Sequence, residues 1–199
     1  LFAHSKEIEL DELLIRKAKV TEGLDEFSGF IDMVSLVEKL RETRVFAGFS
    51  RLLANRPEDV PNPQKLLWDK WPHNKKDRWL PAAAVQGEGI FLRLSENKLK
   101  EWETREDVVE RATILQKNYD EVVAKYKWEN RCVSPRLLMM HSLAHLLINQ
   151  LVFECGYGAA SLRERLYVSN DTNKPMSGIM IYTASGDSAG SMGGLVRMG

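Results

Sequence analysis

The sequence predicts an α+β fold, in which a small mixed sheet packs on a central buried helix with additional amphipathic helices around it. Three observations support this prediction. Apolar residues recur every three or four positions in several segments, as on one face of a helix. Short runs rich in β-branched and aromatic residues are bounded by glycine and proline, as strands are. Residues 135–154 are apolar nearly all round, which is typical of a buried helix.

The first part of the chain combines helical and strand patterns. Prolines at positions 57, 61 and 63 predict a long surface loop in its middle, because proline lacks a backbone donor and has a fixed φ. The predicted elements are helices at residues 8–18 and 33–42, a strand at 44–53, and a hairpin of two short strands at 79–85 and 89–94.

Three further helices and two strands are predicted after residue 94. Ser95 is a good N-cap residue, and Ser134-Pro135 is a typical helix start. The predicted helices cover residues 96–103, 106–126 and 135–154, and the strands cover residues 162–168 and 178–183. We expect the sheet to contain residues 44–53, 79–94, 162–168 and 178–183, and to pack on the helix at 135–154.

Charge divides the chain into two portions. Residues 1–130 hold most of the charged side chains and form a charged helical and strand-hairpin portion, whereas residues 131–199 form a buried helix with a two-strand, glycine-rich portion. The whole chain has 28 basic and 28 acidic residues, so a nucleic-acid surface must be a local patch. We expect the chain to be one fragment of a larger protein.

The two cysteines, Cys132 and Cys155, lie far apart in the sequence and outside any C-x-x-C pair. This usage fits a reducing compartment and predicts a cytoplasmic protein. No uninterrupted apolar run reaches the roughly 18 residues of a membrane span, so we expect no membrane partner.

Residues 186–190 read Gly-Asp-Ser-Ala-Gly and match the nucleophile elbow of the α/β-hydrolases. In that fold an acid and then a histidine follow the serine, but none of the eleven residues after Ser188 is His, Asp or Glu. The pattern therefore predicts no catalytic residue, with Ser188 in a glycine-rich packing turn. A turn that binds an anion at a helix N-terminus, and a serine hydrolase that uses Ser188, are the alternatives.

His141 and His145 are four residues apart on the predicted apolar helix, the spacing of the H-E-x-x-H zinc motif. Ser142 occupies the position of the general-base glutamate, and a third ligand is not obvious. We interpret the pair as buried polar side chains with hydrogen-bond partners, and assign no metal ligand. Metal binding by the pair is the alternative.

Tryptophans and cations alternate between Trp68 and Trp79. Aromatic faces stack on bases and cations neutralise phosphates, so this composition suits single-stranded nucleic acid. A solvated loop whose tryptophans pack on the domain, and a partner-protein surface, are the other interpretations. The residues predicted to bind nucleic acid or a partner are Lys70, Trp71, Lys75, Lys76, Arg78 and Trp79.

Four blocks of the sequence resemble, in order, the DrmB family, a subunit of the bacterial DISARM antiphage system. The third block, which begins MMHSLAHLLINQ, is the most specific. The last two blocks also resemble the zinc-binding accessory domain of MrfA-type helicases, in which a cysteine cluster for zinc comes next. The blocks are residues 37–52, 79–94, 139–168 and 178–199.

This resemblance implies a non-enzymatic accessory subunit of a phage-defence complex, which helps a helicase-like partner to bind DNA. It implies no cofactor for residues 1–199, with zinc bound by residues beyond Gly199 in a full-length protein. The chain contains no P-loop, so ATP-driven translocation would belong to the partner. A serine hydrolase and a pure protein-interaction module are the alternatives from other classes.

Overall fold

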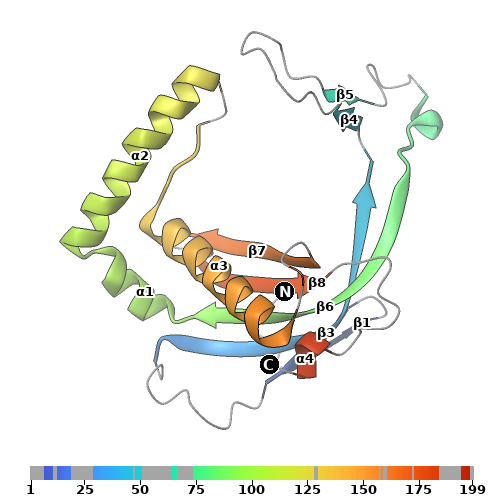
Figure 1. Cartoon of the computed structure of the whole chain (residues 1–199), viewed down its shortest axis with the longest axis horizontal. Coiled ribbons are helices and arrows are strands. Elements are labelled where there is room, and N and C mark those ends of the chain that lie inside the picture. Colours follow the sequence, from blue (N-terminus) through green and yellow to red (C-terminus); the bar gives the residue numbers. More distant parts are fainter. Residues whose placement is uncertain are drawn as a thin grey trace.

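A computed structural model of the chain confirms the α+β class (Figure 1). It contains a six-stranded sheet, a separate two-stranded ribbon and four α-helices among the residues that the structure describes. These residues are 7–10, 13–18, 29–46, 48–50, 64–66, 74–127, 130–156, 158, 161–171, 173–183 and 194–197.

The large sheet is antiparallel at each of its five strand pairings, so the prediction of a mixed sheet was wrong. Only residues 170–175 separate the strands Leu162–Ser169 and Met176–Thr183, and a connection that short gives an antiparallel pair. Its order is β1 (Glu7–Leu10), β2 (Leu13–Lys17), β3 (Ile31–Val45), β6 (Ala82–Leu94), β8 (Met176–Thr183) and β7 (Leu162–Ser169). The ribbon pairs β4 (Gly48–Ser50) with β5 (Gln64–Leu66).

The predicted strands at 162–168 and 178–183 are confirmed as β7 and β8, but three predictions nearer the N-terminus were wrong. The predicted helix at 8–18 is the pair β1 and β2, and the predicted helix at 33–42 lies within β3. The predicted hairpin at 79–94 is one strand, β6, which pairs with β3 along nearly its whole length. Pairing between distant segments overrides local preference in such strands. The predicted strand at 44–53 is in part correct, because it covers the end of β3 and β4.

The three predicted helices after residue 94 are confirmed. They are α1 (Glu96–Glu103), α2 (Glu106–Tyr126) and α3 (Pro135–Cys155). Ser134 Oγ accepts a hydrogen bond from Leu137 N at 3.2 Å and caps α3, and Gly156 ends the helix with a φ of 70°. A short fourth helix, α4 (Gly194–Arg197), lies against β6 and β3.

The sheet buries side chains on both faces. One face packs on α3 through residues such as Leu94, Leu162 and Ile179, and Met140 and Ala144 come from the helix. On the opposite face a second cluster joins four buried side chains, Ile15, Val37, Phe91 and Met180. The alternation between Ile179 and Met180 follows from the period of two along a strand.

Helix α3 packs on the sheet as predicted, but with one face only, so the prediction of a central buried helix is only in part correct. Leu146 and Phe153 are 66% and 87% exposed. The segment Pro135–Glu154 is long and apolar enough to cross a membrane by length and composition alone, but a helix that packs on a sheet passes the same test. Figure 1 shows α3 lying across β7 and β8, with α1 and α2 beside it.

Strands β3 and β6 are much longer than the others and continue past the sheet as a two-stranded arm. Figure 1 shows this arm rising toward β4 and β5. Its far end pairs Val45 with Ala82, and Phe46 N donates to Pro81 O at 2.9 Å. Val45, Phe46 and Trp79 are all more than half exposed there. The far end of the arm therefore places Trp79 at the surface, away from the core.

Candidate functional site

The structure describes the second part of the predicted nucleic-acid segment. Residues Lys75–Asp77 form a single 3₁₀ turn, in which the side chain of Asn74 accepts a hydrogen bond from Lys76 N at 3.1 Å. Arg78 and Trp79 lead from this turn into β6. Lys70 and Trp71, which belong to the same prediction, lie outside the described residues.

Lys75, Lys76 and Arg78 are exposed, and Trp79 is 63% exposed. The arm thus brings three cations and one aromatic face together at the surface, with the carboxylate of Asp77 among them. Such a surface can neutralise phosphates and stack on a base. Its binding of nucleic acid or of a partner stays a prediction.

Ser188 and the rest of the Gly-Asp-Ser-Ala-Gly stretch lie outside the described residues, between β8 and α4. The structure does describe the start of α4. There the backbone N–H of Leu195 donates to Glu88 Oε1 at 2.9 Å, and Glu88 is 3% exposed. The carboxylate of Glu88 thus accepts a hydrogen bond at the N-terminus of α4. An external anion at a helix N-terminus was the alternative interpretation of this glycine-rich segment.

His141 and His145 are 53% and 59% exposed, so the prediction that they are buried was wrong. They lie on the flank of α3 that faces β7, where the sheet ends and solvent begins. Their Nε2 atoms are 3.0 Å apart. Glu164 Oε1, from β7, lies 3.2 Å from His141 Nε2 and 4.0 Å from His145 Nε2. The structure therefore supplies a third side chain that the helix sequence did not show.

The sequence analysis missed Glu164 because this residue lies on a strand and not on the helix. Its position in the alternating pattern of β7 nevertheless shows which face of the sheet it is on. Leu162, Leu166 and Val168 all pack against the α3 face of the sheet. Alternate residues of a strand share one face, so Glu164 points to this same face. A carboxylate in an otherwise apolar row beneath a histidine-bearing helix is a feature that sequence reasoning can search for.

A buried ion-pair network fixes α3 relative to its neighbours. Arg136, in the first turn of α3, is 1% exposed. Its guanidinium donates to Glu96 at 2.7 and 3.0 Å and to Glu103 at 2.6 and 3.2 Å, both on α1. It also donates to the carbonyl of Ser169 at 2.8 Å, at the end of β7. The network therefore holds α1, α3 and β7 together, and with them the two histidines and Glu164.

The surroundings of Arg136 favour its charged form. Burial alone would lower the pKa of Arg136, but the hydrogen bonds and charges of Glu103 and Glu96 outweigh it and raise that pKa. Bidentate pairing of a planar guanidinium with carboxylates gives both strength and a fixed geometry. Arg136 is thus a positioning residue for the site on α3 and β7.

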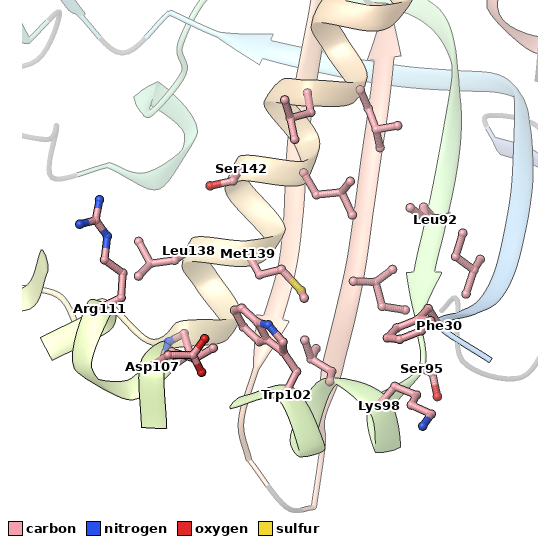
Figure 2. A pocket seen from close by; sticks show the side chains of 18 of the residues that line it. Phe30, Leu92, Ser95, Lys98, Trp102, Asp107, Arg111, Leu138, Met139 and Ser142 are labelled. Atoms are coloured by element: carbon pink, nitrogen blue, oxygen red, sulfur yellow. The ribbon is translucent and has the colours of Figure 1, made fainter. Parts of the chain in front are cut away.

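An open groove with a volume of about 980 Å³ lies between α1, α2 and α3. Apolar side chains form most of it, and Figure 2 shows Trp102, Met139 and Leu138 around it with Lys98, Asp107 and Arg111 at its margin. Few polar groups converge inside the groove, so its chemistry suits an apolar occupant and not a phosphate backbone.

Two comparisons with known proteins show what this chain resembles. Residues 143–198 match the family described as the MrfA Zn-binding domain. The chain is also 34% identical over 185 residues to the DISARM protein DrmB of Bacillus paralicheniformis, strain ATCC 9945a. This alignment covers 92% of the chain and 32% of the relative. The chain is a homologue of part of DrmB, and the resemblance predicted from its four sequence blocks is confirmed.

The family name implies zinc, which proteins bind through cysteine sulfur, histidine nitrogen and carboxylate oxygen. Among the described residues one group of three such side chains brings its ligand atoms within 4.8 Å of one another: His141, His145 and Glu164. Two of the three lie inside the matched region, and His141 lies two residues before it. These residues fit a three-ligand site.

Proposed function

We propose that this chain is part of a DrmB-type accessory subunit of a bacterial phage-defence complex, which acts in the cytoplasm and helps a helicase-like partner to bind DNA. The observation that carries the proposal is the 34% identity to a DISARM protein over 92% of the chain. In this proposal the chain has no catalytic role, and the ATP-driven step belongs to the partner.

The arm formed by β3 and β6 supports the DNA part of the proposal. Lys75, Lys76, Arg78 and Trp79 come just before β6 in the sequence, and their side chains are exposed. Cations there would neutralise phosphates of either strand, which gives affinity without sequence preference. Trp79 would add base stacking on a single strand, such as a helicase exposes.

The test is a fluorescence titration of single- and double-stranded oligonucleotides at two salt concentrations. Lys75→Ala with Lys76→Ala should weaken binding for every sequence and reduce the slope of log K against log salt by about 0.7 per lysine on single strands. Trp79→Ala should weaken single-strand binding by about 1–3 kcal/mol and leave that slope nearly unchanged.

The matched control is Lys117→Ala with Lys174→Ala, which removes the same charge from two exposed lysines on α2 and in the β7–β8 turn. This control should lower the affinity much less. Unchanged binding in the arm variants, with an unchanged circular dichroism spectrum, would contradict the DNA role of the arm and favour a protein-interaction module.

A further inference from the structure

We propose that His141, His145 and Glu164 form a binding site for a divalent transition metal, with zinc as the best-suited ion, that links α3 to β7. This inference does not depend on DNA binding. It rests on the positions of three side chains from two elements, with Glu164 following His141 by 23 positions and His145 by 19 positions in the sequence.

The first argument is geometric. Zinc–ligand bonds of about 2.0–2.1 Å place the ligand atoms of a tetrahedral site about 3.3–3.4 Å apart. The three separations here are 3.0 Å between the two Nε2 atoms, and 3.2 and 4.0 Å from them to Glu164 Oε1. An ion would fit among these atoms after a small movement of the His145 ring toward Glu164.

The second argument is the state of Glu164. Its side chain is 25% exposed, and its Oε2 atom is buried without a hydrogen-bond partner among the described residues. A buried carboxylate oxygen without a partner is unfavourable, because its desolvation is not offset. A bound cation beside Oε1 would neutralise the carboxylate and relieve part of that penalty.

The third argument is the donor set. Two imidazoles and one carboxylate are the protein ligands of many catalytic zinc sites, in which water takes the fourth position. Both histidine rings are more than half exposed, so the open position would face solvent. Imidazole ligands also suit Ni²⁺ and Cu²⁺, whereas Mg²⁺ and Ca²⁺ prefer oxygen ligands only.

The structural consequence would be a cross-link between helix and sheet. β7 is the outermost strand of the described sheet, next to β8, and α3 packs on both. A metal held by both elements would fix β7 to α3 near the start of the strand, whereas the Arg136 network holds the end of the strand at Ser169. Without a metal, the two rings would form an ordinary hydrogen bond, with one ring as donor and the other as acceptor.

The experiment measures zinc binding to the metal-stripped full chain by competition with a chromophoric chelator, and follows Co²⁺ by its visible absorption. We expect one zinc per chain, an intense Co²⁺ spectrum typical of four-coordination, and a higher melting temperature with zinc. His141→Asn, His145→Asn and Glu164→Gln should each weaken zinc binding by at least about 100-fold, because loss of a mere outer-shell partner already weakens it 10–100-fold.

The matched control is Glu154→Gln, which changes the same residue type as Glu164→Gln, on α3 and outside the cluster. It should leave zinc affinity within about twofold of the unchanged chain, since Glu154 contributes no ligand atom to the cluster. Failure of the unchanged chain to bind zinc at micromolar concentration would overturn the proposal and leave a hydrogen-bonded cluster. Zinc affinity in the three ligand variants equal to that of the unchanged chain would also overturn it, because the zinc would then be held by other side chains.

Discussion

At the scale of single residues, Arg136 is a buried charge that joins α1, α3 and β7. Its two carboxylate partners, Glu96 and Glu103, lie on the same face of α1 about two helical turns apart. Glu96 and Glu103 retain 24% and 15% exposure, so the network reaches solvent at one side. A charged residue in the first turn of an otherwise apolar helix was visible in the sequence, but its partners were not, because they lie more than thirty positions away.

We predict that Arg136→Met destabilises the fold by about 3 kcal/mol, because it leaves two carboxylates without their buried partner. The control is Arg105→Met. Arg105 pairs with Asp107 at 2.8 Å, but both side chains are more than 60% exposed, so its loss should reduce stability far less. Urea unfolding followed by circular dichroism measures both effects.

A further variant separates the ion pair from simple packing. Adding Glu96→Gln and Glu103→Gln to Arg136→Met should recover part of the lost stability, because no uncompensated charge then remains. Equal destabilisation by Arg136→Met and Arg105→Met would show that the buried network does not hold α1, α3 and β7 together.

At the scale of elements, β6 and β8 approach unusually closely around Gly89. A Cβ atom on Gly89 would lie 2.6 Å from the carbonyl oxygen of Ile181 and 2.8 Å from Tyr182 Cβ. Gly89 and Tyr182 are direct partners across the two strands. The sequence predicted a turn between strands at residues 79–85 and 89–94, with Gly89 at the start of the second strand. In the structure these residues form one strand, and Gly89 allows its close contact with β8.

We predict that Gly89→Ala destabilises the fold by about 1–3 kcal/mol, because the added methyl group must push backbone atoms apart. The control is Gly158→Ala, where an added Cβ meets nothing within 4 Å and the φ is not positive. This control should change stability by no more than about 0.5 kcal/mol. Thermal unfolding of both variants checks the difference, and similar melting temperatures would contradict the close approach of β6 and β8.

At the scale of the whole molecule, the later elements were predictable because their signals are local. The start and end of α3 follow from a serine cap, a proline and a glycine, α2 has apolar residues every three or four positions, and β7 and β8 are short runs with clear boundaries. The N-terminal strands were not predictable in this way. Met33, Val37 and Leu40 have helical spacing, yet all three pack on one face of the sheet. A register shift between Val37 and Leu40 in the pairing of β3 with the distant strand β6 restores this common face.

The candidate sites were likewise predictable only where their residues lie close together in the sequence. The i, i+4 histidine pair was visible because it lies on one helix, whereas Glu164 required the knowledge that β7 runs beneath α3. The cations and Trp79 were visible as a run of residues, but only the long β3–β6 pairing places them at the end of an arm.

The groove between α1, α2 and α3 also depends on the whole molecule, and it gives the last prediction. Exposed apolar surface on this scale binds apolar dyes in a native protein. We predict that the folded chain enhances the fluorescence of an anilinonaphthalene sulfonate dye, and that Leu146→Ser reduces this enhancement several-fold. Leu146 lines the groove and is 66% exposed, so its replacement should remove dye contacts with little loss of stability. Ile114→Ser is the matched control, because Ile114 is also exposed, at 47%, on α2 but not among the residues that line the groove. If both variants reduce the fluorescence equally at unchanged melting temperature, the dye binds elsewhere, and the groove is not the main apolar surface of the chain.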